Sequence, residues 1–218
     1  QFYPSRLDLE PRSVAVENHA LHLGYRVLYY RYDKIVTPKT LIRELYHKGV
    51  LGVLVALQST QNLSLLLDHD WSQFQMVVAS SNHRLSSFHL ACGNIFESIR
   101  LTWAKLHSLG YKRIGWAVLK HPDNEYDDFV RSACIAECQS NTIVKHRVPP
   151  YKNSLFDDAR LFGKWYLTYK PDVVVGFHAG QYYWLKDLGI RIPEDVAFCQ
   201  LHSENQVSDP FDIAGIVN

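Results

Sequence analysis

Short apolar runs alternate with amphipathic segments along most of the chain. The runs 52–57 (GVLVAL) and 172–177 (DVVVGF) are apolar at almost every position, whereas 94–109 and 155–169 repeat apolar residues at helical spacing. A strand that is apolar throughout is buried on both faces, so helices must cover both sides of its sheet. The pattern therefore predicts an α/β fold built on parallel strands.

The same pattern predicts where the individual elements lie. The expected helices are 14–23, 38–46, 94–109, 123–138, 155–169 and 181–188. The expected strands are 26–30, 52–57, 75–79, 87–91, 113–119, 142–148, 172–177 and 195–201. Four of the helices run into a glycine, which can adopt the left-handed conformation that ends a helix: Gly24, Gly49, Gly110 and Gly189.

The alternation of strand and helix restarts near Gly110 and divides the chain into two parts of similar length. We therefore predict two doubly wound parallel-sheet lobes, 1–109 and 110–218. In such sheets ligands bind beyond the carboxyl ends of the strands. Two facing lobes would place a ligand in a cleft between them, and a hinge could close that cleft.

Composition excludes several classes of function. The formal net charge is +1, so these 218 residues lack the excess of Lys and Arg that grips DNA through its phosphates. No segment approaches the roughly 20 apolar residues of a membrane span. The four cysteines match no zinc pattern, and Cys134 and Cys138 lie four apart on an expected helix. Buried thiols in a reducing, cytoplasmic compartment are expected, with no metal and no cofactor.

Three stretches carry a resemblance to a known family. They are 107–115 (HSLGYKRIG), 170–177 (KPDVVVGF) and 188–198 (LGIRIPEDVAF), and their order and separations also agree with the family pattern. Together they resemble the effector-binding domain of LacI/GalR transcriptional regulators, which has the periplasmic-binding-protein-like type I fold. The segment 70–74 (DWSQF) is similar to a divergent subgroup of these regulators.

The resemblance implies a function for the chain. Lobes of this kind close on a small effector, most often a carbohydrate, and so change the DNA affinity of a cytoplasmic homodimer. The DNA-binding helix-turn-helix of the family is not among these 218 residues, and 214–218 resembles the segment that returns to the first lobe. A domain incomplete at both termini is therefore expected, which contacts DNA through a missing N-terminal domain and has no contact with a membrane.

Aligning the family motifs locates the residues that would read the ligand, and this chain departs from the usual residue at each main position. Asn94 replaces a common Asp, the pocket Arg falls near Asp127 or Asp128, and Arg131 lies one turn later. His178 and His202 stand where the family has Asn-Asp and Asp. The predicted ligand-binding residues are Asn94, Tyr126, Asp128, Arg131, Tyr151, His178 and His202.

The chemistry of these residues leaves alternatives open. Asn and neutral His each offer a donor and an acceptor to a hydroxyl. Two histidines near a ligand could also make the site pH-sensitive or favour an anion, or they could belong to a pocket that has drifted and binds little. Tyr126, Tyr151 and Trp184 could stack on a sugar or pack in the core, and for Trp184 packing is favoured.

Two other classes of function compete with the sensor domain. A periplasmic sugar-binding protein of an ABC transporter would have the same fold. A glycosidase would need two carboxylates about 5–10 Å apart across a sugar, and no motif in the chain places a nucleophile beside a base. The chain is predicted to be a binding module and not an enzyme.

Overall fold

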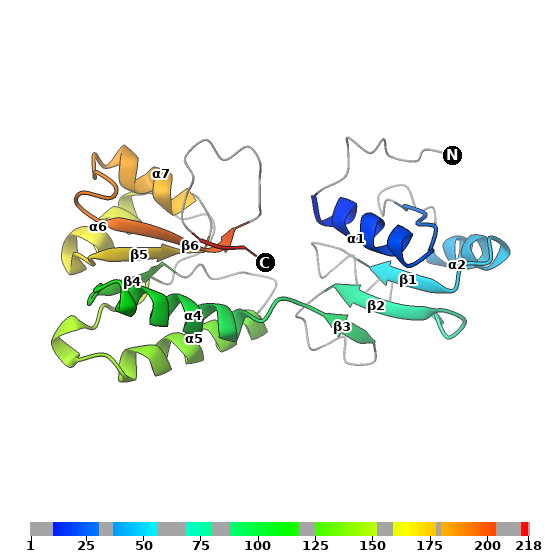
Figure 1. Cartoon of the computed structure of the whole chain (residues 1–218), viewed down its shortest axis with the longest axis horizontal. Helices are drawn as coiled ribbons and strands as arrows, with labels where there is room; N and C mark the ends of the chain where they lie inside the picture. The colour runs from blue at the N-terminus through cyan, green and yellow to red at the C-terminus, as the bar shows by residue number, and fades with distance from the viewer. Residues whose placement is uncertain are drawn as a thin grey trace. The chain divides into compact units, whose positions relative to one another are not determined.

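The computed structural model describes residues 11–30, 37–55, 69–79, 88–117, 125–151, 159–177, 180–203 and 215–217. The chain forms two compact units, Gln1–Ala79 and Ser80–Asn218. The strands form two separate sheets, each with its own helices (Figure 1).

The first sheet has the strand order β1-β2-β3. Its strands are β1 (Gly52–Val55), β2 (Gln75–Ala79) and β3 (His89–Ala91). The helices α1 (Pro11–His22) and α2 (Pro38–His47) precede them in the chain. Strands β1 and β2 run parallel, with Val53 opposite Met76. The helix α2 buries Leu41 and Leu45, while Met76 and Val78 of β2 are buried on the sheet. Apolar residues four apart on the helix therefore form the inner face of this small layer.

The second sheet has the strand order β4-β5-β6-β7, and every neighbouring pair is parallel. Its strands are β4 (Ile114–Ala117), β5 (Val173–Gly176), β6 (Ala197–Ser203) and β7 (Gly215–Val217). Its helices are α4 (Ile95–Ser108), α5 (Glu125–Ser140), α6 (Ala159–Tyr169) and α7 (Gly180–Asp187). The helices α4 and α5 cover one face, and α6 and α7 cover the other (Figure 1). This three-layer arrangement confirms the predicted α/β fold with parallel sheets.

The central strand β5 shows why its apolar residues do not alternate with polar ones. Val173 and Val175 lie in a core with Ile99 of α4 and Ile135 of α5. Val174 points to the opposite core, which contains Phe162 of α6 and Leu185 of α7, among other residues. All four residues of β5 are buried, so each face of the strand is enclosed as predicted.

The predicted glycine stops are confirmed at all four positions. Gly24, Gly49, Gly110 and Gly189 have φ values of 82°, 67°, 95° and 76°. After α4, the N–H of Gly110 donates to the carbonyl of His107 at 3.0 Å, and that of Tyr111 donates to the carbonyl of Leu106 at 3.1 Å. These two bonds satisfy carbonyls at the helix end, which only a residue tolerant of positive φ permits without strain.

Two predicted strands are wrong. Residues 25–30 form no strand, and the Tyr30 hydroxyl instead donates to the carboxylate of Glu44 on α2 at 3.1 Å. In 142–148 the chain forms a 3₁₀ turn at Val144–His146, and the Arg147 guanidinium donates to the carbonyls of Thr142 and Ser140. In both segments β-branched or aromatic residues gave a strand pattern, but propensity for a strand acts only where a neighbouring strand supplies a surface to pack on.

The helix α4 belongs with the second sheet, although the predicted lobe limits place it in 1–109. It contributes Ile99 and Leu106 to the core shared with α5 and β4. The compact units are divided between Ala79 and Ser80, and β3, which follows that division, still belongs to the first sheet. The lobe limits 1–109 and 110–218 stay a prediction.

Cysteine burial follows the prediction only in part. Cys134 and Cys138 are buried on α5 and Cys199 is half-buried, but Cys92 is exposed. Burial raises the pKa of Cys138 to about 12 and that of Cys199 to about 11, so both thiols are protonated at neutral pH. Among the described helices, none has the length and apolar character needed to cross a bilayer.

Candidate functional site

A charged pair and an aromatic ring meet at the carboxyl end of the second sheet. Phe177 directly follows β5, and the guanidinium carbon of Arg131 lies 4.7 Å from the centre of its ring. Arg131 also donates from Nη2 to Oδ1 of Asp128, forming an ion pair within α5. A cation on an aromatic face is held by the ring's quadrupole, so Phe177 and Asp128 together orient the guanidinium.

Helical spacing brings Asp128 and Arg131 together. Residues three apart lie on the same side of a helix and can pair. The two side chains differ in exposure, at 4% for Arg131 and 17% for Asp128. The guanidinium is therefore held inside the protein, while the carboxylate is the more accessible partner.

Gln181 forms a second polar element at this end of the sheet. It is fully buried near the start of α7, and its Nε2 donates to the carbonyl of Ala117, the last residue of β4, at 3.4 Å. Space beside it is tight: a Cβ on Gly176 would lie 3.1 Å from Oε1 of Gln181 and 2.5 Å from Cζ of Phe198. Glycine at 176 therefore lets α7 approach the end of β5.

These groups can recognise a polar ligand. A carboxylate accepts hydrogen bonds from hydroxyls, a guanidinium donates several in a fixed plane, and an aromatic face packs on apolar surface. They stand where parallel α/β sheets place their ligands, beyond the carboxyl ends of the strands. Asp128 and Arg131 are among the predicted ligand residues, and their role in ligand binding stays a prediction. Phe177 and Gln181 are not among them, although both lie near the end of the predicted strand 172–177.

Two predicted ligand residues have structural roles. Asn94 is the N-cap of α4, where its side-chain oxygen accepts from the N–H of Glu97 at 3.1 Å. Tyr151 is buried, with ring centres 5.4 Å from Phe162 and 5.7 Å from Trp165. It packs in the core beneath α6 and α7, whereas the Asp128–Arg131 pair comes from α5 on the other face.

The remaining predicted residues are described less fully. Tyr126 lies in α5, and His202 lies in β6 two residues past Gln200, which pairs with Gly176; only their backbone is described. His178 lies outside the described residues. Trp184 packs against the core of α6 and α7, with its ring centre 5.5 Å from that of Phe162, so the favoured packing role is confirmed.

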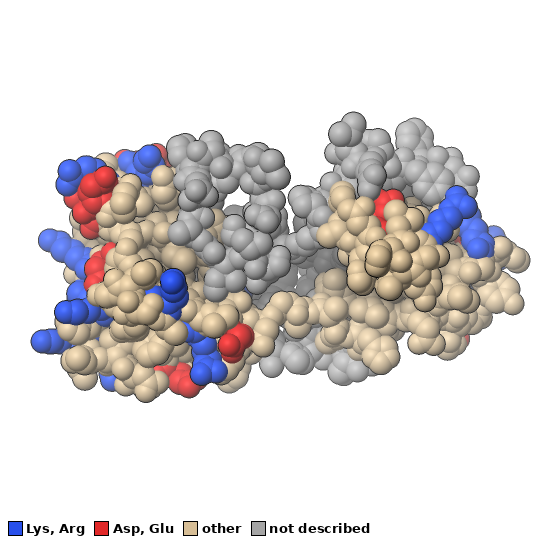
Figure 2. Space-filling model, viewed as in Figure 1, with Lys and Arg blue, Asp and Glu red and all other residues tan. Residues whose placement is uncertain are grey.

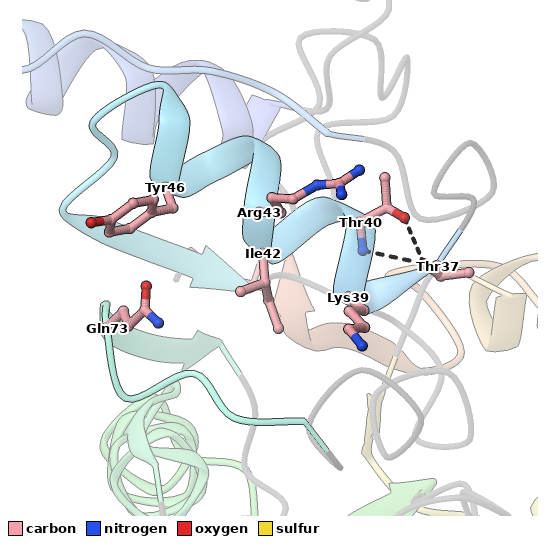
Figure 3. Close-up of a pocket in the computed structure, with 7 residues that line it drawn as sticks. All are labelled: Thr37, Lys39, Thr40, Ile42, Arg43, Tyr46 and Gln73. Carbon is pink, nitrogen blue, oxygen red and sulfur yellow. Dashed lines mark hydrogen bonds between the residues drawn. The ribbon is translucent and has the colours of Figure 1, made fainter.

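An open pocket on the first unit was not predicted. It is lined by Thr37, Lys39, Thr40, Ile42, Arg43, Tyr46 and Gln73. Figure 3 shows Thr37 and Thr40 at one end and Tyr46 and Gln73 at the other. The oxygen of Thr37 accepts from the N–H of Thr40 at 3.2 Å and so caps α2. Most of the lining is the outer face of α2, opposite its buried leucines, which explains the basic and polar side chains there.

Charge is distributed unevenly over the second unit. On the face drawn in Figure 2, Lys and Arg side chains gather at the end from which β5 and β6 start. There the Arg113 guanidinium donates to the carbonyls of Lys145 and Tyr169, and Asp172 accepts from the N–H groups of Lys112 and Arg113. Helices end where parallel strands begin, so cations at this edge complement the helix C-termini. Among the described residues, no three His, Cys, Asp or Glu side chains gather as a metal site.

Several solved structures with this architecture are described as LacI-family transcriptional regulators. No family model matches the sequence, and no curated protein does. A regulator from Arthrobacter sp. in complex with lactose has 15% identity and a TM-score of 0.64, covering 94% of this chain and 77% of that one. A transcription regulator like protein from Staphylococcus haemolyticus has 11% identity and a TM-score of 0.61, covering 93% and 74%.

A third solved structure agrees with these two. A putative ribose operon repressor from Burkholderia thailandensis has 19% identity and a TM-score of 0.60, covering 88% of this chain and 73% of that one. At such identities the likeness concerns the fold. The chain thus has the α/β fold of LacI-family regulators, as the resemblance of its sequence motifs predicted.

Proposed function

We propose that this chain is the ligand-sensing domain of a LacI/GalR-like transcriptional regulator and that it binds a small polar molecule of the sugar class. The observation that carries this proposal is the cluster of Asp128, Arg131 and Phe177 at the carboxyl end of a parallel sheet. Similar structures support the class of ligand, since one was solved with lactose and another with glucose.

The regulator half of the proposal concerns DNA and a second copy of the chain. Ligand binding would shift the balance between two conformations of a homodimer and so change the DNA affinity of a helix-turn-helix outside these residues. We place this activity in the cytoplasm. The cleft between lobes that the resemblance implies, and the roles of Tyr126, His178 and His202, remain predictions.

Thermal unfolding with a panel of sugars tests the sensing function. We expect lactose, D-glucose, D-ribose or a related sugar to raise the Tm, because a ligand that binds only the folded state stabilises it by mass action. Lys164→Ala, an exposed change on α6, serves as the matched control and should respond as the parent does. No rise with any sugar at millimolar concentration would contradict the proposed ligand class.

A second experiment tests regulation. Full-length protein is mixed with DNA from the region upstream of its own gene neighbours, with and without the stabilising sugar, and DNA binding is measured by fluorescence anisotropy. We expect binding whose affinity changes at least about fivefold with the sugar, a typical allosteric coupling. Absence of DNA binding would contradict the proposed role in transcriptional regulation.

A periplasmic sugar-binding protein of a transporter is the second candidate. One similar solved structure, from Alkaliphilus metalliredigens and in complex with D-xylulofuranose, is described as a periplasmic binding protein/LacI transcriptional regulator (14% identity, TM-score 0.57, covering 88% of this chain and 71% of that one) and so does not favour the transporter over the regulator. Sugar binding without DNA binding would support this candidate. Under either function the sugar is released unchanged, and chromatography of the sugar after long incubation checks this expectation.

A further inference from the structure

Arg131 is a buried cation whose charge is compensated inside the protein. Its side chain is 4% exposed, its Nη2 donates to Oδ1 of Asp128, and its guanidinium lies over the ring of Phe177. A guanidinium removed from water is costly unless a counter-charge and hydrogen bonds accompany it. The carboxylate of Asp128 supplies such a counter-charge.

The place of Asp128 suggests what that carboxylate does beyond stabilising Arg131. Asp128 is in the first turns of α5, near the end of the helix where the dipole and the unpaired N–H groups attract negative charge. A buried guanidinium beside a helix N-terminus is an arrangement that binds phosphate and carboxylate groups. In this protein the carboxylate of Asp128 occupies the anion position beside Arg131.

We propose that Asp128 is a specificity-determining residue that makes the site select uncharged ligands over anionic ones. Its carboxylate takes the position that a ligand's phosphate or carboxylate would need, and it would repel such a group at close range. An uncharged polyhydroxylated ligand meets no such repulsion and can donate its hydroxyl protons to the carboxylate. This inference rests on the proposed function, because it assumes that ligands bind at this end of the sheet.

The test compares four proteins with inorganic phosphate as the probe: the parent, Asp128→Asn, Asp128→Glu and the double variant Asp128→Asn/Arg131→Met. Asn keeps the shape of the side chain and removes its charge, whereas Glu keeps the charge. Phosphate affinity is measured by titration calorimetry and by Tm, with sodium chloride at matched ionic strength as the reference. We expect Asp128→Asn to bind phosphate at least about tenfold more tightly than the parent, and the Glu and double variants to show no gain.

Each outcome decides the proposal. Recovery of folded Asp128→Asn only in phosphate, and not in matched chloride, also supports it, because the anion then replaces the carboxylate. Equal phosphate binding by the parent, a gain that persists without Arg131, or an Asn variant that stays unfolded in phosphate would overturn it. Failure of the parent to bind any sugar counts against the proposed function alone and leaves the phosphate comparison intact.

Discussion

The two ends of the second sheet each contain an arginine and an aspartate, used in opposite ways. At the amino end, Arg113 donates to main-chain carbonyls and Asp172 accepts from main-chain N–H groups. At the carboxyl end, Arg131 bonds to the side chain of Asp128 and lies over that of Phe177. Charges tied to the backbone hold loops in place, whereas charges tied to side chains can exchange a partner for a ligand.

The two ends of one sheet are therefore expected to differ in role: the amino end stabilises the fold, and the carboxyl end also binds the ligand. The amino end carries bonds whose partners are fixed by the fold, so its residues should affect unfolding and leave ligand binding unchanged. The carboxyl end should affect both. Variants at the two ends therefore test whether stability and ligand recognition are separate.

The largest effect is expected for Asp128→Ala. Removing one member of a buried ion pair leaves the guanidinium of Arg131 without this counter-charge, and we expect the free energy of unfolding to fall by about 4 kcal/mol. Urea unfolding followed by circular dichroism measures the change. A loss below about 1 kcal/mol would mean that Arg131 does not depend on Asp128.

A somewhat smaller loss is expected for Asp172→Ala at the amino end. Its carboxylate accepts from the N–H of Lys112 at 2.8 Å and from that of Arg113 at 3.0 Å. Losing these charge-assisted bonds should lower the free energy of unfolding by about 3 kcal/mol. Asp172→Asn keeps one acceptor and should lose about half as much. The Kd for the sugar should not change in either variant; a tenfold weaker sugar affinity would contradict the separation of roles.

Gly176→Ala should cost about 2 kcal/mol through overpacking. The added Cβ would lie 2.5 Å from Cζ of Phe198 and 3.1 Å from Oε1 of Gln181. Because the side chains of Phe198 and Gln181 must shift at the strand end, sugar binding should weaken together with stability. Gly24→Ala, in open space at a helix end with positive φ, provides a control that strains the backbone without crowding a neighbour. That control should leave sugar affinity intact.

The smallest effect concerns acid stability at the amino end, where Arg191 and Asp195 pair before β6. Hydrogen bonds from Arg191 lower the pKa of Asp195 to about 2 from its ordinary value of 3.8. Because the folded-state pKa is the lower one, the pair stabilises the fold above about pH 4, and this contribution is lost as the pH falls towards 2. The Tm difference between the parent and Asp195→Asn should therefore shrink over that interval, and a constant difference would show that the pair does not act through its charge.

Most of the fold of the second unit could be predicted because local and tertiary signals agree there. The unbroken valines of β5 need two covered faces, and the glycines after α4 and α7 end those helices wherever they pack. The strand predictions at 26–30 and 142–148 fail for reasons that no periodicity records: the Tyr30 hydroxyl bonds to Glu44 of α2, and Ile143 and Val144 are exposed.

The site was predictable only in part, for a related reason. Asp128 and Arg131 are charged residues at helical spacing, so they stand out in the sequence. Phe177 acquires its role only when α5 packs beside the end of β5, and Gln181 only when α7 packs beside the end of β4. The family motif predicts Asn94 as a ligand residue. An Asn followed by Glu97 also matches a helix-capping pattern, and in the structure Asn94 caps α4.

The most direct test of the proposed ligand site is sugar binding by the double variant Asp128→Leu/Arg131→Met. Apolar residues of similar size can replace a buried ion pair with little loss of stability, so this variant separates recognition from folding. We expect a Tm within a few degrees of the parent in buffer and no rise in Tm with the sugar that stabilises the parent. An unchanged rise in Tm would show that the sugar binds elsewhere and would contradict a ligand site at Asp128 and Arg131.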